Sequence, residues 1–288
     1  MAYGRAVRAV GGVLACGLLM TGCSGSGSGA AGSPRAAPSA TDAGTSASAR
    51  TGTGTSARTG TGTSTGVSPR PSGPAFTPDP AKVPRTAEAA RELARAVVAG
   101  PELWGPGFVA RTPALSAPGH WPVLDERCVW QGGTVPAGVL HSVTSYSERP
   151  AGAGRGTLRV AATVTVHRDV RRAEWEMAET LEEALRCPGQ KLREGERVEG
   201  LMSIGHAFGS KYNLTADDSI GEIGRYRGTE SGDRPYEYGW FQYRLGNVTV
   251  AAVTKGADGH TQDEINRARV DALVGMARRI ETRLETAG

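Results

Sequence analysis

Between Leu158 and His167, apolar and polar residues alternate along the chain, which predicts a β-strand with one buried face. Residues 235–245 and 247–254 predict two more strands, and the Gly246-Asn247 pair between them is typical of a tight hairpin turn. The polar side of the first strand carries Arg159, Thr163, Thr165 and His167.

Three segments have a helical pattern of apolar residues. The first begins after Thr86 and closes at Gly100, and the second begins after Asp169 and runs to Cys187. Thr261-Gln-Asp-Glu264 is a capping box that opens the third. The apolar residues on one side of the second helix are Ala173, Met177, Leu181 and Ala184, and those of the third are Ile265, Ala268, Ala272, Met276 and Ile280.

A strand followed by a helix therefore occurs twice in the second half of the chain. This order predicts an α+β domain over residues 81–288, with an antiparallel sheet and helices packed on one face. A pseudo-duplication of the strand–helix unit is compatible with the pattern.

The amino terminus has the features of an export signal. Arg5 and Arg8 precede an uncharged apolar run from Ala9 to Met20, which is shorter than the roughly twenty residues that span a bilayer. The run ends in Leu19-Met20-Thr21-Gly22-Cys23, which resembles the lipobox of bacterial lipoproteins. This resemblance implies that the signal peptide, residues 1–22, is removed and that Cys23 carries the lipid.

Residues 23–80 are rich in Ser, Thr, Gly, Ala and Pro, and Ala49–Ser56 is repeated as Ala57–Ser64. Such a segment has few large apolar side chains to bury, so we expect a disordered tether between the lipid and the domain. O-glycosylation of its Ser and Thr residues remains a second interpretation.

The charge distribution argues against a nucleic-acid partner. The chain has a formal charge of +4, from 33 basic and 29 acidic residues. Six of the basic and two of the acidic residues lie in the first 80 positions, so residues 81–288 hold 27 of each and are neutral. Residues 81–288 therefore have no excess of basic residues of the kind that binds the phosphates of a nucleic acid.

Two cysteines remain beside Cys23 in the exported chain. Because export leads to an oxidising compartment, Cys128 and Cys187 are predicted to form a disulfide, with a catalytic thiol or a metal pair as alternatives. Cys128 is also expected to begin a short strand.

The Cys128-Val-Trp130 motif, the alternating strand, the helix that ends at Cys187 and the final Gly246-Asn-Val-Thr-Val250 strand together resemble the PknH-like extracellular domain family. The resemblance covers roughly residues 100–285. It implies an α/β domain with a groove that binds an unknown ligand and performs no chemistry.

The sequence offers few candidates for a catalytic or metal-binding motif. The five histidines are not spaced as metal ligands, and Cys-x-x-Cys is absent, so no metal or cofactor is expected. Ser203 lacks the first glycine of a nucleophile elbow. Glu182-Glu183 is interpreted as part of a solvated helix face, and Asp217-Asp218 as a loop pair, with calcium binding as the alternative.

The densest aromatic segment is the strand predicted over residues 235–245. Tyr236, Tyr238 and Trp240 share one face and form a candidate ligand groove, although a core position is the other interpretation. Gly239 interrupts the opposite face, as expected where another group comes close.

These observations together predict a lipoprotein on the extracytoplasmic face of the cell membrane. Its domain is expected to be a non-catalytic, sensor-like module, anchored to the membrane by lipid, that binds a small molecule, a lipid or an envelope protein. An envelope hydrolase with a non-contiguous active site is the alternative.

The lipid anchor is tested by Cys23→Ala. We expect this variant to leave the membrane fraction or to accumulate as unprocessed precursor, because the lipidated thiol is gone. Fractionation followed by mass measurement checks this. A variant that stays membrane-bound at the mature size would contradict lipidation.

Overall fold

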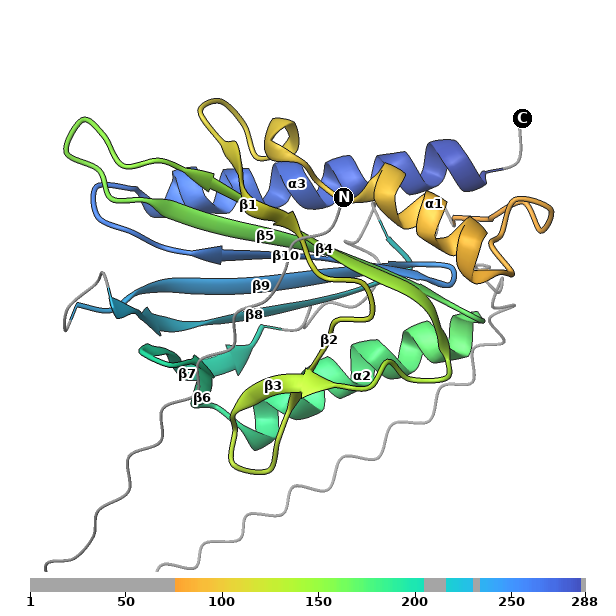
Figure 1. The fold of residues 1–288 in the computed structure, drawn as a ribbon, viewed down its shortest axis with the longest axis horizontal. Coiled ribbons are helices and arrows are strands. Elements are labelled where there is room, and N and C mark those ends of the chain that lie inside the picture. The colour runs from red at the N-terminus through yellow and green to blue at the C-terminus, as the bar shows by residue number, and fades with distance from the viewer. Residues whose placement is uncertain (1–75, 205–215, 230–233, 286–288) are drawn as a thin grey trace, which may run out of the picture. The chain divides into compact units, whose positions relative to one another are not determined.

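The computed structural model describes residues 76–204, 216–229 and 234–285, so the predicted signal peptide, Cys23 and most of the predicted tether lie outside it. The described part forms an eight-stranded sheet, a two-stranded sheet and three α-helices, which confirms the α+β class (Figure 1). The elements in chain order are α1 (Ala87–Val97), the short 3-10 helix η1 (Pro101–Leu103), β1 (Val109–Leu115), β2 (Trp121–Leu124), β3 (Trp130–Gly133), β4 (Val139–Arg149), β5 (Leu158–His167), α2 (Val170–Arg186), β6 (Gln190–Arg193), β7 (Glu196–Ser203), β8 (Asp218–Arg227), β9 (Tyr236–Leu245), β10 (Val248–Lys255) and α3 (Gln262–Leu284).

The three helices begin where their caps predict. Thr86 Oγ1 accepts a hydrogen bond from the backbone N–H of Ala89, and the side chain of Asp169 accepts one from Arg172. Thr261 and Glu264 form the reciprocal capping box at the start of α3.

The large sheet is antiparallel throughout, and its strand order is β1-β4-β5-β10-β9-β8-β7-β6. The strands β5 and β10 lie at its centre, and one face of this pair packs against α1 and α3. Its side chains are at most 2 % exposed, and all of them except Thr254, which accepts a hydrogen bond from Arg269 of α3, are aliphatic. The aliphatic ones form the main core; they are Leu158, Val160, Ala162, Val164, Val166, Val248, Val250 and Ala252.

The helix α2 lies on the other face of the sheet, as its contacts show. They are made with the side chains of the central strands that point away from α1 and α3. Glu176 of α2 accepts hydrogen bonds from Gln242 (2.8 Å) and Thr249 (2.9 Å) and pairs with His167 (2.6 Å). The expected placement on one face therefore holds for α1 and α3 but not for α2. The polar side of β5 is buried here because α2 supplies its hydrogen-bond partners, and Thr165 and His167 are only 1 % and 2 % exposed.

This arrangement does not fit a simple duplication. A two-fold rotation that exchanges the antiparallel neighbours β5 and β10 leaves the faces of the sheet unchanged. Such a rotation would place the helices that follow these strands on one face, whereas α2 and α3 lie on opposite faces.

The side of α2 that faces the sheet differs in part from the predicted one. Ala173, Met177 and Ala184 are buried as expected, but Leu181 is 40 % exposed. Thr180 lies on the inner side and donates to Gln242 of β9 (2.8 Å). Because the partner surface offers polar atoms there, a hydroxyl fits better than the leucine side chain.

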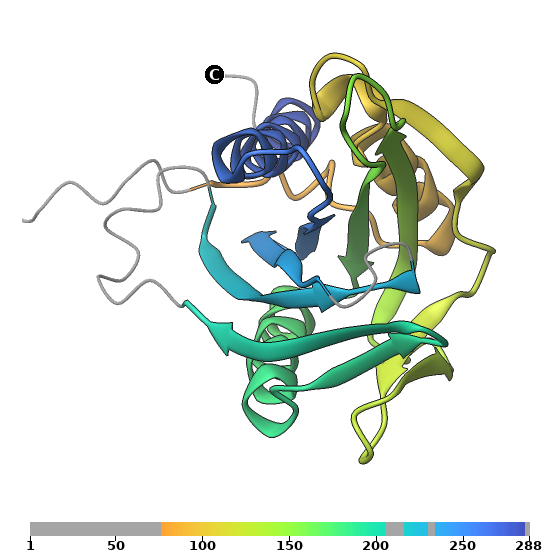
Figure 2. The same ribbon diagram turned by 90° about the vertical axis from the view of Figure 1, so that its left-hand side faces the viewer.

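Figure 2 shows that the sheet curls, so that its two edges approach each other on the side of α2. The β2–β3 hairpin lies near one edge and is held against β6. Cys128 and Cys187 form the predicted disulfide, and the backbone N–H of Lys191 donates to the carbonyl of Cys128 (2.8 Å). Cys128 does not begin a strand: it lies in a turn with φ of 60°, and β3 starts at Trp130.

Removal of the disulfide by Cys187→Ser should lower the unfolding free energy by about 4 kcal/mol, because the bridge closes a long loop in the unfolded chain. Thermal and urea unfolding of the oxidised proteins check this loss. The double variant Cys128→Ser/Cys187→Ser is the control for a reactive leftover thiol. An unchanged melting temperature in both variants would show that the bridge does not stabilise the fold.

Candidate functional site

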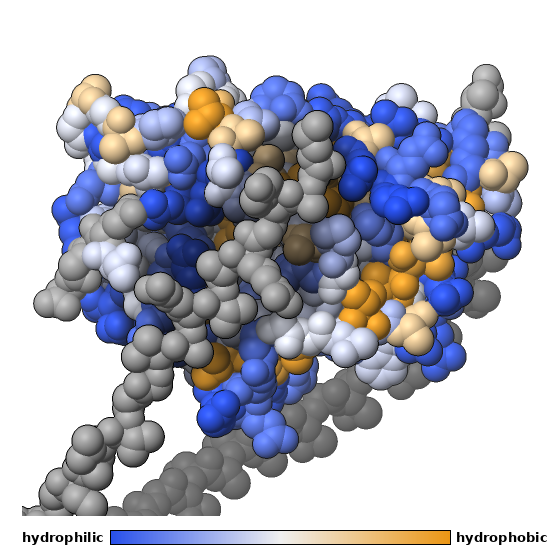
Figure 3. Space-filling model, viewed as in Figure 1, coloured by the Kyte–Doolittle hydropathy of each residue, from blue (hydrophilic) through white to orange (hydrophobic). Residues whose placement is uncertain are grey.

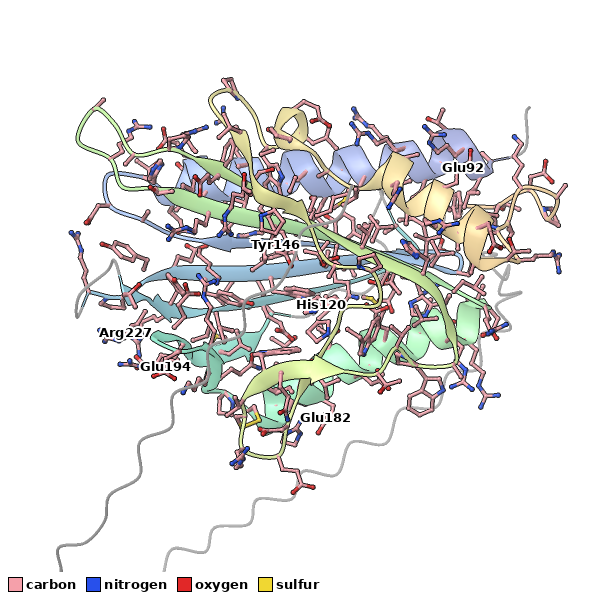
Figure 4. The ribbon with its side chains drawn as sticks, viewed as in Figure 1. Glu92, His120, Tyr146, Glu182, Glu194 and Arg227 are labelled. Carbon is pink, nitrogen blue, oxygen red and sulfur yellow. A yellow bond between two sulfur atoms is a disulfide. The ribbon has the colours of Figure 1, made fainter. Side chains whose placement is uncertain are left out.

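A cavity of about 260 Å³ lies on the side of the sheet that faces α2, beside Trp240. We call it the Trp240 groove. Its walls come from strands that are far apart in the sequence, and the lining side chains are Arg111, His120, Pro122, Thr144, Tyr146, Arg159, Ala161, Thr163, Leu192, Arg193, Glu196, Trp240, Val253 and Lys255. Figure 4 shows two of them, His120 and Tyr146, near the middle of the molecule, whereas Glu92 lies at one end on α1.

The register of the sheet explains why a hollow forms here. Across four neighbouring strands, Tyr146 of β4 pairs with Ala161, Ala161 with Val253, and Val253 with Trp240 of β9. The backbone positions of Tyr146 and Trp240 are therefore three inter-strand spacings apart, about 14 Å measured across the strands. Since the residues between them are small, they leave space that the rings border on either side.

The three aromatic residues of β9 that form the candidate groove, Tyr236, Tyr238 and Trp240, take different places. Trp240 is half-buried and lines the groove, as the ligand interpretation expects. Tyr238 is 7 % exposed and belongs to a small core with Ala184, so the core interpretation applies to it. Tyr236 borders a neighbouring recess of about 60 Å³.

The close approach that we expect at Gly239 is made by Arg269 of α3. A Cβ atom at this position would overlap the guanidinium group of Arg269. That group donates to Thr254 (2.8 Å) and lies over the ring of Phe241, 4.2 Å from its centroid. Gly239 therefore makes room for a buried cation on the α3 face and not for a ligand.

Positive charge is concentrated at one end of the groove. Arg111 and Arg159 share the carboxylate of Glu148, at 3.5 and 3.8 Å. Arg193 and Lys255 share that of Glu196, and the Lys255 Nζ atom lies 2.7 Å from it. Burial alone would raise the pKa of Glu196, but the hydrogen bonds from both cations lower it to about 2. The face drawn in Figure 3 is likewise mostly hydrophilic, with apolar residues in separate patches.

Two carboxyl groups outside the lining of the groove have raised pKa values, the buried Glu222 and the half-buried Glu183. Glu222 of β8 is the cross-strand neighbour of Trp240, and burial raises its pKa to about 8, with Glu183 adding to the effect. Burial also raises the pKa of Glu183 to about 7. Glu183 is half-buried, so only Glu182, which is exposed, lies on the solvated face predicted for both.

The other candidates from the sequence have structural roles. Asp217 accepts from the backbone N–H of Gly246 (2.7 Å) and pairs with Arg244 (3.4 Å), so it supports the β9–β10 turn. The Ser203 hydroxyl donates to the carbonyl of Gly221 (3.5 Å). Within residues 76–204, 216–229 and 234–285, no three His, Cys, Asp or Glu side chains gather in a way that could hold a metal ion. No helix of this part is long and apolar enough to cross a membrane.

Most groove residues were missed from the sequence. The alternation of apolar and polar residues places Arg159 and Thr163 on the polar side of their strand, and nothing in the sequence marks Tyr146 or Lys255 as a site residue. What these residues share is their position on the side of a strand opposite the core. That position indicates a groove only when the curl of the sheet is known.

Comparison with known proteins gives distant structural similarity. No family model matches the chain, and no curated protein matches it. A solved structure of the extracellular domain of PknH from Mycobacterium tuberculosis is 11% identical, with a TM-score of 0.46, over 70% of this chain and 99% of that chain. An uncharacterized protein from Mycobacterium smegmatis is 11% identical, with a TM-score of 0.30, over 62% of this chain and 90% of that one. Membership in the PknH-like family stays a prediction.

The raised pKa values predict how stability depends on pH. In the unfolded chain Glu222 titrates near 4.5, whereas in the folded chain it holds its proton to about pH 8. The favourable contribution of the protonated Glu222 to the stability of the folded chain is therefore fully present below pH 4.5. It is lost as the pH rises to about 8.

We expect Glu222→Gln to reduce the loss of unfolding free energy between pH 5 and pH 9, by on the order of 3 kcal/mol. Urea unfolding at a series of pH values measures this difference. Glu92→Gln, on the exposed side of α1, is the matched control. Parallel pH profiles for the wild type and Glu222→Gln would rule out a buried neutral carboxyl group.

Proposed function

We propose that this chain is a cell-envelope lipoprotein whose folded domain binds a small ligand in the Trp240 groove without transforming it. The observation that carries the proposal is the groove itself. It is a preformed concave site in which two aromatic rings, Tyr146 and Trp240, and several polar and charged side chains converge, and concave sites are where proteins usually bind small ligands.

The geometry favours binding over catalysis. The aliphatic hydroxyl groups in the described lining of the groove are those of Thr144 and Thr163, and they hydrogen-bond to each other (2.9 Å), whereas a hydroxyl nucleophile needs an adjacent general base. The buried pair of His167 and Glu176 is a different feature, because both side chains are bonded within the α2 interface. Its histidine is only 2 % exposed and serves to hold the helix on the sheet.

The proposed location rests on the amino-terminal sequence. The apolar run from Ala9 to Met20 and the lipobox-like Leu19–Cys23 segment support export and lipidation. The Cys128–Cys187 disulfide supports an oxidising compartment outside the cytoplasm. A domain held at the membrane surface by a lipid and a tether is well placed to sample ligands of the envelope.

The groove is tested by a ligand-observed NMR screen of small aromatic compounds, neutral and charged, on the full chain. We expect Trp240→Ala to weaken the binding of the hits at least tenfold, because the ring supplies most of the apolar contact area. Trp175→Ala is the matched control, since Trp175 is 54 % exposed on the outer side of α2.

The stability of each variant is measured in parallel. Because Trp240 is half-buried, its loss should cost about 2 kcal/mol, less than the 3–5 kcal/mol of a fully buried ring. Hits that bind the wild type and Trp240→Ala equally well would show that the ligand site is elsewhere.

A further inference from the structure

A second hollow lies on the other face of the sheet, beside α3. Figure 2 shows α3 and α2 on opposite sides of the sheet. The helix α3 packs on β10 and β9 and leaves parts of β8 and β7 uncovered. The cavity between the helix and these strands has a volume of about 750 Å³. We call it the α3 groove, and its size is that of a pocket for a small molecule.

One part of the α3 groove is apolar and open to water. Met202 of β7, Ile204 and Val270 of α3 line it and are 57 %, 41 % and 48 % exposed. Ile223 of β8 and Phe241 of β9 add two more apolar side chains to the lining. Large apolar side chains that gather around one hollow and stay exposed mark an interaction site.

Two glycines keep the floor of the α3 groove low. A Cβ atom at Gly221 would overlap the ring of Phe241, and one at Gly239 would overlap the guanidinium group of Arg269. Because this ring and this guanidinium group lie so close to the backbone, they do not fill the space between β8 and α3.

A cation without a partner lies in the same groove. Arg225 of β8 is exposed, and its side chain makes no hydrogen bond or ion pair with any residue that the structure describes. Its cross-strand neighbours Glu199 and Glu237 are carboxylates, but both bond to other cations. Glu199 pairs with Arg227 (2.9 Å). Glu237 pairs with Arg269 (3.5 Å).

The charged and apolar parts of the α3 groove follow one another along the strands. Arg225 and Ile223 are two residues apart on β8, which is about 7 Å, and Met202 is the cross-strand neighbour of Ile223. Along α3 the lining runs from Gln262 to Val270, about 12 Å. A ligand that matches this shape is a single apolar chain with an acidic group at one end.

We propose that the α3 groove binds a fatty acid, with its carboxylate at Arg225 and its chain along Ile223 and Met202 toward Ile204 and Val270. The carboxylate can accept hydrogen bonds from the guanidinium group at the exposed mouth, so it stays hydrated and ionised. The methylene groups leave water in the apolar part. A free fatty acid suits the site better than a membrane surface, because the apolar side chains line a hollow that takes one chain. This proposal does not depend on the Trp240 groove, which lies on the other face.

The test is calorimetric titration of the full chain with octanoate, decanoate and 1-octanol. We expect decanoate to bind about fifteenfold more tightly than octanoate, because two more methylene groups leave water. We expect 1-octanol to bind about fivefold more weakly than octanoate, because it lacks the charge that pairs with an exposed arginine.

Four variants locate the ligand. Arg225→Met should weaken octanoate about fivefold and leave 1-octanol unchanged, whereas Arg225→Lys keeps the charge and should retain most of the affinity. Met202→Gln places an amide in the apolar part without much change of shape, so it should weaken all three probes about tenfold. Leu185→Gln is its matched control, because Leu185 is 72 % exposed on α2 and lies outside the groove. All three positions are exposed, so we expect melting temperatures close to that of the wild type.

Four results would overturn the proposal. The first is failure of decanoate to bind, and the second is equal affinity for octanoate and decanoate. The third is 1-octanol binding as tightly as octanoate, which would remove the acidic group from the ligand class. The fourth is binding that Arg225→Met and Met202→Gln leave unaltered and that Trp240→Ala weakens, because the chain would then occupy the Trp240 groove.

A second copy of the chain is the rival occupant. Sedimentation velocity of the wild type and of Met202→Gln tests it. We expect monomers in both cases, and a wild-type dimer that Met202→Gln separates would overturn the fatty acid as the occupant.

Discussion

The antiparallel pairing of β5 and β10 forms the centre of the sheet, and the rest of the structure depends on what packs against the two faces of this pair. On one face the pair presents aliphatic side chains and the single hydroxyl of Thr254, and α1 and α3 bury them. This is the main hydrophobic contribution to the fold. The other strands extend the sheet outward from this pair, so the position of every groove residue depends on it.

The opposite face is divided between a helix and a cavity. Along one half, Thr165, Thr249 and Gln242 are satisfied by groups of α2 and of neighbouring strands, so polar residues are buried without loss of hydrogen bonds. Along the other half, Ala161, Thr163 and Val253 are too small to fill the space inside the curl of the sheet. The disulfide holds the β2–β3 hairpin to the end of α2 and β6, next to this half.

The charged groups near the cavity follow from the same division. Glu196 is ionised because two cations donate to it, whereas Glu222 and Glu183 are buried against rings and aliphatic groups and tend to keep their protons. One side of the groove therefore carries formal charges and the other carries neutral polar groups and rings.

Local sequence determined those features whose partners lie nearby in the chain: the helix caps at Thr86, Asp169 and Thr261, the β9–β10 turn, and the alternation of β5. The pairing of Cys128 with Cys187 also followed, since these are the two cysteines that lie beyond the amino-terminal segment.

Only the tertiary structure decided the groove. The strands β1, β4, β7 and β8 carry many small or polar residues, so their alternation is weak and their pairing depends on neighbours distant in sequence. Whether Arg159 or Glu183 faces solvent or the interior depends on the curl of the sheet and on the face that α2 covers. Both result from long-range packing, because the periodicity of a single segment defines two sides but not what lies against each.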